Sequence, residues 1–144
     1  MPLGFHIDVE REVLFVRGWG TVTDADVRAH ASALRLDPRF DATWPLLADG
    51  REITDLRVTG GFLRHYQSPL DGATRRVFVV ASDVVFGMAR MYGFLATDDD
   101  EAVAVVRSLS AALAWLGLPE ETPFPVELDT VVGAPSARST GRRA

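Results

Sequence analysis

The sequence predicts a single α/β domain with a mixed, mostly parallel sheet of four to five strands and about four helices. Two short apolar runs, 46–48 and 76–81, have the composition of strands buried on both faces. Segments with helical periodicity lie between and after these runs, which is typical of parallel strands joined by right-handed crossovers. The chain begins with two alternating segments that indicate a hairpin. The expected order is therefore ββαβαβαβα.

The composition of the chain excludes several classes of function. A chain of 144 residues fits one domain. With a net charge of −5 and no basic cluster, nucleic acid is not an expected partner. There is no Cys and no Lys, which excludes disulfides, thiolate nucleophiles, Cys-ligated metals and Schiff-base lysines. We find neither a signal-peptide pattern nor an apolar run near the about 20 residues that span a bilayer, so we expect a cytoplasmic location and no cofactor.

The hairpin is predicted over residues 4–10 and 12–19. Its first strand alternates, so two sets of side chains should face opposite sides of the sheet. These sets are Phe5, Ile7 and Val9 on one side and His6, Asp8 and Glu10 on the other. Gly18-Trp19-Gly20 is expected to end the second strand.

The first helix is predicted to begin after Thr23, a natural N-cap with the acidic Asp26 at its third following position. Core-facing residues then recur at helical spacing, and Asp37-Pro38 ends the helix. These residues are Val27, His30, Ala31 and Leu34. His30 is thus interpreted as a packed core histidine.

The central strand is predicted over residues 45–50. The stretch 52–59 fits either a loop packed on the core or an extension of this strand. A helix over 61–67 follows, then a buried strand over 76–81 and a helix over 83–96. An edge strand over 102–107 and a helix over 109–118 complete the predicted domain, with Leu109, Leu113 and Leu116 on the buried side of that helix.

We divide the chain into a domain, 1–118, and a tail, 119–144, rich in Pro, Ser and Gly. Such a composition is typical of an extended or mobile segment. The tail's apolar residues could still lie along the surface of the domain. They are Phe124, Val126 and Leu128.

Four local sequences, in this order, resemble STAS-domain proteins of the SpoIIAA-like group, relatives of bacterial anti-sigma-factor antagonists. They are Gly-Trp-Gly-Thr-Val-Thr at 18–23, Leu-Leu-Ala-Asp-Gly-Arg at 46–51, Gly-Met-Ala-Arg-Met at 87–91 and Ala-Leu-Ala-Trp-Leu-Gly at 112–117. The resemblance covers roughly residues 4–118. It implies a STAS fold and a regulatory or ligand-binding domain rather than an enzyme.

The resemblance does not extend to the phosphorylation switch of these antagonists, which uses a Ser in an Asp-x-Ser-Gly turn. The corresponding stretch here is 56–61, where Thr59 precedes Gly60 but the Asp and the Ser are missing. Thr59 is therefore either an N-cap or, less in keeping with the motif, a phosphorylated residue at a helix N-terminus.

The helix 83–96 has an unusual distribution of apolar residues. One broad face is expected to be buried, and it comprises Val84, Val85, Met88, Met91, Tyr92 and Leu95. The opposite face carries Phe86, Arg90 and Phe94. Two phenylalanines there need a cover, which could be a partner subunit, the helix 61–67, the tail, lipid, or another part of the same chain.

These patterns predict a non-catalytic module that binds a protein partner or an apolar small molecule through helices 61–67 and 83–96. Arg90 would meet a carboxylate or phosphate head, and a homodimer is also compatible. The apolar contacts would be Phe62, Tyr66, Phe86, Met91 and Phe94. The alternative is a lipid-binding or membrane-associating protein that uses the same helices.

Polar residues at the end of the central strand form a second candidate site, because open α/β sheets bind ligands at the carboxyl ends of their strands. Asp49, Arg51 and Glu52 could contact a polar head group, or could form a local ion pair in a turn. The three histidines show no catalytic or metal-binding spacing. The acidic stretch 98–101 fits a solvated turn better than a cation site.

Overall fold

The computed structural model describes residues 3–65, 75–96, 102–125 and 127–132, with the side chains of 63–65 and 92–96 outside the description. The elements, in order, are β1 (Leu3–Asp8), β2 (Val13–Thr23), α1 (Asp24–Leu36), β3 (Leu46–Arg57), α2 (Gly60–His65), β4 (Arg76–Val79), α3 (Asp83–Ala96), β5 (Val103–Val106), α4 (Leu109–Leu116) and β6 (Thr130–Val132). The predicted order is confirmed as far as α4. A further strand, β6, follows from the segment predicted as a tail.

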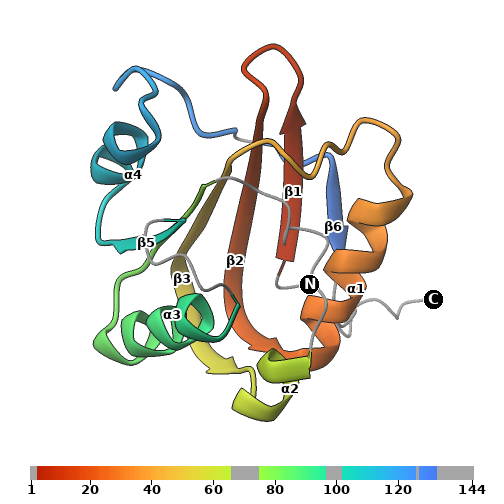
Figure 1. Ribbon diagram of the computed structural model, residues 1–144, viewed down its shortest axis with the longest axis vertical. Helices are drawn as coiled ribbons and strands as arrows, with labels where there is room; N and C mark the ends of the chain where they lie inside the picture. The colour runs from red at the N-terminus through yellow and green to blue at the C-terminus, as the bar shows by residue number, and fades with distance from the viewer. Residues whose placement is uncertain (1–2, 66–74, 97–101, 126, 133–144) are drawn as a thin grey trace, which may run out of the picture.

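The strands form one mixed sheet in the order β5-β4-β3-β2-β1-β6 (Figure 1). The pairs from β2 to β5 are parallel, whereas β1 is antiparallel to both β2 and β6. The sheet is therefore mixed and mostly parallel, as predicted, but the described part of the chain contributes six strands instead of four to five. Among the described residues, no helix is long and apolar enough to cross a membrane.

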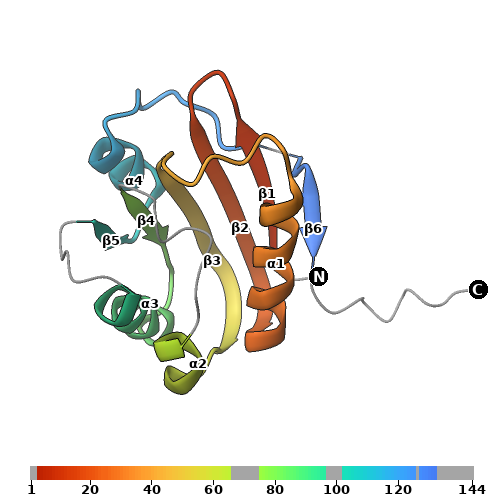
Figure 2. The ribbon, with the colours of Figure 1, turned by 45° about the vertical axis from the view of Figure 1, so that its right-hand side comes forward.

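β2 and β3 are longer than predicted and form the centre of the sheet (Figure 2). The expected end of β2 near residue 19 is wrong, because the strand continues through Gly20 with a register shift on each side of it. Gly20 has φ +64°, a left-handed conformation that suits glycine at a bulge. The stretch 52–57 is accordingly a strand extension paired with β2.

The start of α1 confirms the predicted cap. The Thr23 hydroxyl accepts a hydrogen bond from the backbone N–H of Asp26 at 3.3 Å, and the Asp26 carboxylate accepts one from the Thr23 N–H at 2.9 Å. This reciprocal arrangement is a capping box, and it satisfies two backbone donors that the helix leaves without partners. It fixes α1 directly at the end of β2.

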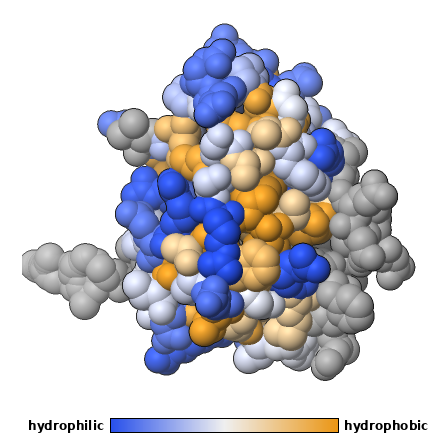
Figure 3. Space-filling view, turned by 90° about the vertical axis from the view of Figure 1, so that its left-hand side faces the viewer, coloured by the Kyte–Doolittle hydropathy of each residue, from blue (hydrophilic) through white to orange (hydrophobic). Residues whose placement is uncertain are grey.

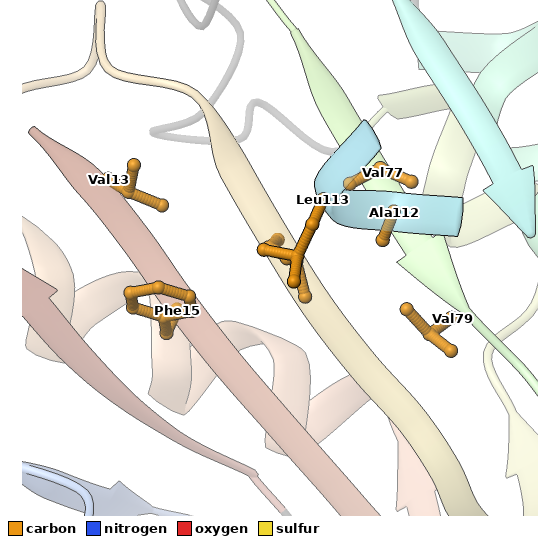
Figure 4. Packing of buried hydrophobic residues seen from close by; sticks show 7 residues of the cluster. Val13, Phe15, Val77, Val79, Ala112 and Leu113 are labelled. Atoms are coloured by element: carbon orange, nitrogen blue, oxygen red, sulfur yellow. The ribbon is translucent and has the colours of Figure 1, made fainter. Parts of the chain in front are cut away.

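The two faces of the sheet carry separate clusters of buried residues. On one face, α4 packs against β2, β3 and β4, and Figure 4 shows Ala112 and Leu113 of α4 meeting Val77 and Val79 of β4. On the other face, α1 packs around Leu34 and α3 around Val85. Leu109 and Leu116 also pack against the α4 cluster, as predicted.

The segment predicted as a tail contributes to the domain. Phe124 packs edge-on against Phe15, with ring centroids 5.3 Å apart, and β6 pairs with β1. Asp129 joins this segment to β1: its carboxylate accepts hydrogen bonds from His6 Nδ1 at 2.9 Å and from the Ile7 N–H at 3.0 Å. Arg39 forms an ion pair with the same carboxylate at 3.2 Å. Val126 lies outside the described residues.

Burial alone would raise the pKa of Asp129, but the hydrogen bonds from His6 and Ile7 outweigh it and hold the pKa below its usual value. The stabilisation is thus present above the unfolded pKa and is lost as the pH falls through the lower, folded pKa. We predict that Asp129→Asn lowers the free energy of unfolding by about 1 kcal/mol at neutral pH and accelerates amide exchange of residues 130–132. Urea unfolding and hydrogen exchange measure these two effects.

Glu127→Gln is the matched control, because Glu127 is exposed and has no ion pair within the described part of the chain. It should leave both quantities unchanged. Equal exchange rates at β6 in the Asp129→Asn variant and the wild type would show that the carboxylate does not hold the strand.

Candidate functional site

A cavity of about 190 Å³ lies between α1, α3 and the face of β2, β3 and β4 that these helices cover. Its walls are mostly apolar. Wall residues come from all five elements, and they include Val22, Val27, Ile53, Leu56, Phe78 and Met88. Figure 1 shows α2 between α1 and α3, at the end of the long β2–β3 pair.

The cavity exists because small residues occupy the strands where α1 and α3 diverge. Gly18 of β2 and Ala48 and Gly50 of β3 all line it. A Cβ atom at Gly18 would lie 3.0 Å from Ile53 Cδ1, so the position has no room for a larger residue while Ile53 stays in place. α1 packs on its own cluster and α3 on another, and Phe78 bridges the two.

His30 of α1 is a polar residue in this wall, and only 7% of the residue is exposed. Its ring meets Phe5 edge-on, with centroids 5.5 Å apart. Nε2 is buried and has no hydrogen-bond partner among the described residues. Burial lowers the pKa of His30 from 6.5 to about 4, so the imidazole is neutral at physiological pH.

Asp49 is the second polar side chain in the wall, and its hydrogen bonds are already made. The carboxylate accepts from Arg51 Nε and Nη2, both at 2.9 Å, and from the Arg51 N–H at 3.1 Å. Burial alone would raise the pKa of Asp49, but these bonds outweigh it and hold the pKa below its usual value. Asp49 is therefore a carboxylate neutralised by its own strand.

The three polar residues predicted to act together, Asp49, Arg51 and Glu52, thus do not form one site. The ion pair between Asp49 and Arg51 is confirmed, but the predicted turn at the strand end is wrong, because both residues lie within β3. Glu52 is exposed and pairs instead with Arg17 of β2, at 3.5 Å between Oε1 and Nε. Of the three residues, Asp49 is the one that lines the cavity among the described residues.

The buried face predicted for α3 is partly wrong. Val84 is 72% exposed and Met91 is 38% exposed, whereas Val85 and Ala89, one turn apart, are buried. The side of the molecule that carries α3 and β5 displays a patch of apolar residues beside hydrophilic ones (Figure 3). The helix is rotated relative to the prediction because α3 packs on the sheet through a narrow stripe of small and β-branched residues.

Phe86 is covered from within the chain. It packs against the cluster around Val85, and the guanidinium carbon of Arg107 lies 4.6 Å from its ring centroid. Arg107 is held there by hydrogen bonds to the Ala81 carbonyl at 3.2 Å and to Asp83 at 2.8 Å. For Phe86, an internal cover is therefore observed, whereas the side chain of Phe94 lies outside the described residues.

The other predicted contacts are not brought together at the cavity. Phe62 is half-buried beneath Arg28, whose guanidinium carbon is 4.7 Å from the ring centroid. Arg90 is exposed. Tyr66 and the side chain of Phe94 lie outside the described residues, so their predicted roles stay predictions. Phe62, Phe86, Arg90 and Met91 are absent from the described wall of the cavity.

Within the described residues, no group of three or more His, Cys, Asp or Glu side chains could hold a metal ion. The acidic stretch 98–100 and Glu101 lie outside the description. His30 and Asp49 both line the cavity, yet no hydrogen bond joins them in the described structure, and Arg51 occupies the carboxylate.

Sequence reasoning missed the cavity itself. It placed His30 correctly on the buried side of α1. It could not show that Nε2 would be left without a partner, because that depends on the residues that separate elements of the fold bring around it. A signal was present in the small residues Gly18, Ala48 and Gly50 on adjacent strands.

Comparisons with known proteins add no assignment: no family model and no curated protein sequence matches this chain. The relation to STAS domains stays a prediction from its residues and element order.

We predict that His30→Leu changes how stability depends on pH. The folded pKa of His30, about 4, lies below the unfolded value of 6.5, so protons bind the unfolded state more tightly between these values. The wild type should lose on the order of 3 kcal/mol of unfolding free energy from this residue as the pH falls from 6.5 to about 4. The variant should lack that component.

Urea unfolding of both proteins between pH 4 and 7 measures the difference between their free energies of unfolding. The carboxylates titrate in both proteins, so this difference reports on His30 alone. An NMR titration of the wild-type imidazole should give a midpoint near 4. Parallel pH profiles for the two proteins would contradict the burial of a neutral His30.

Proposed function

We propose that this domain is a non-catalytic binding module that holds a small, neutral, predominantly apolar molecule in the cavity between α1 and α3. The observation that carries the proposal is the apolar cavity of about 190 Å³. Mostly apolar concave sites with few polar groups are typical of small-molecule binding. This proposal keeps the predicted binding function but locates the binding site in the space between α1 and α3 instead of on the surface of α2 and α3.

The volume limits the size of the ligand. A dry cavity of about 150 Å³ in another protein accommodates benzene, whereas sites for drug-sized molecules are about 300–1,000 Å³. The cavity here lies between these cases and close to the smaller one. A single substituted ring, or a short aliphatic chain of roughly ten non-hydrogen atoms or fewer, fits this volume.

The charges around the cavity favour a neutral ligand. Asp49 in the wall is ionised and paired, and His30 is neutral. A ligand carboxylate or phosphate would lose its hydration and meet no unpaired positive group among the described wall residues. Arg90, the predicted partner of an anionic head, is exposed and lies away from that wall.

A relation to STAS domains is part of the proposal. The element order through α4 and the placement of α1 and α3 on one face of the sheet support it. We do not include a phosphorylation switch. Thr59 Oγ1 accepts from the Phe62 N–H at 3.1 Å and donates to Asp24 at 3.1 Å, so a phosphate at Thr59 would lie beside a carboxylate.

A small molecule explains the structure better than a membrane surface does. The lipid alternative needs Phe86 to be available on the outer face of α3, and Arg107 covers that ring. Val84 and Met91 are exposed on α3, but the net charge of −5 opposes adsorption to anionic membranes.

We predict that p-xylene, an apolar probe of suitable size, raises the Tm of the wild type and that Ala89→Leu abolishes the rise. Ala89 lines the cavity and is 9% exposed, so a leucine there would fill space that the probe needs. Thermal unfolding with and without a saturating concentration of p-xylene measures the effect, and NMR shifts report where the probe binds.

Ala114→Leu makes the same chemical change on the exposed side of α4, away from the cavity, and should respond to p-xylene as the wild type does. Absence of any response in the wild type would overturn the proposed function. An undiminished response in Ala89→Leu would place the binding site elsewhere.

A further inference from the structure

We propose, on the basis of the proposed function, that the ligand carries one hydroxyl group that hydrogen-bonds to His30 Nε2. The ligand class is therefore a small phenol or alcohol rather than a hydrocarbon or a carboxylic acid. The inference depends on which polar atoms of the cavity wall already have partners, and on the hydrogen-bonding capacity of a neutral imidazole.

The described wall contains two ionisable side chains, His30 and Asp49. Asp49 is occupied by three hydrogen bonds from Arg51. His30 differs, because its Nε2 is buried without a hydrogen-bond partner in the described part of the chain. Buried polar groups are normally paired, so an unpaired ring nitrogen on a residue of the cavity wall is a place where a ligand group is favoured.

The surroundings of His30 position it for this bond. α1 begins at a capping box and carries the ring toward the sheet, where Phe5 contacts it edge-on. The ring forms part of the cavity wall, but Nε2 itself has almost no accessible surface, so the bond requires the ring to turn about its Cβ–Cγ bond until Nε2 faces the cavity. The remaining wall near it is apolar, with Val27 on the preceding turn of the same helix.

A hydroxyl suits this nitrogen in either protonation pattern of the neutral ring. If Nε2 lacks a proton, the hydroxyl donates to it, and if Nε2 carries the proton, the hydroxyl oxygen accepts. An anionic group could only accept, and its charge would be buried among apolar side chains. A neutral group that can both donate and accept is therefore the best complement to the site.

The test compares p-cresol with p-xylene, which differ by a hydroxyl in place of a methyl group, on the wild type and on His30→Leu. For each protein we take the Kd for p-xylene divided by the Kd for p-cresol. Comparing this ratio between the wild type and the variant cancels the different hydration of the two probes. We expect the preference for p-cresol to fall by about tenfold in the variant.

A second measurement uses the wild type alone. The ¹⁵N resonance of His30 Nε2 should shift on binding p-cresol and not on binding p-xylene, because only the former offers a hydrogen bond. This readout keeps the inference testable if His30→Leu folds poorly.

The outcomes separate the two proposals. If both probes bind and the ratio is the same in the two proteins, with no ¹⁵N shift, the hydroxyl inference is wrong while the binding function stands. If neither probe binds the wild type, the proposed function fails and the hydroxyl inference fails with it. A lost preference in the variant together with the ¹⁵N shift supports both.

Discussion

The parallel pairing of β2 with β3 is the constraint on which the rest of the structure depends. These two strands run through the middle of the sheet, and both of their faces are covered along part of their length. One face of the sheet packs against α4 and the other against α1 and α3. The side chain at each strand position therefore has to suit the helix on the face to which it points. Where the strands extend beyond the well-packed region, register shifts around Gly20 bend the pair. The cavity lies against this stretch.

The cavity between α1 and α3 is a departure from the close packing of the rest of the interior. Protein interiors are normally close-packed, and a space of this size at the junction of two helices forfeits contacts that an extra methyl or methylene group would make. The domain tolerates it because each helix has its own cluster, around Leu34 for α1 and around Val85 for α3. Neither helix depends on the space between them for its position.

The elements that follow local rules could be predicted from the sequence. Thr23 and Asp26 define the start of α1, and the apolar runs define the buried strands. The extension of β3 could not be decided, because Asp49-Gly50-Arg51 has the composition of a turn and only pairing with β2 makes it a strand. The rotation of α3 was predicted wrongly, since Val84, Val85 and Phe86 are all apolar and contacts with Val80 and Phe78 decide which of them is buried.

The site was the least predictable part. Its aromatic residues were expected on the surface of α2 and α3, but Phe86 is held under Arg107 and Phe62 under Arg28. Polar atoms without partners are a property of the assembled structure, so no residue pattern identifies Nε2 of His30. β6 was equally hidden, because three residues carry too little periodicity to indicate a strand paired with the beginning of the chain.

The position of β6 also bears on the solubility of the domain. Without it, β1 would be an edge strand with an unpaired row of backbone N–H and C=O groups, which is a template for pairing with other chains. β6 covers half of that strand, from Leu3 to Phe5, and the Asp129 carboxylate occupies the next N–H, that of Ile7. β6 therefore blocks the addition of a strand from another molecule along half of β1. Beyond that half, the Asp129 carboxylate occupies a backbone N–H that another strand would need.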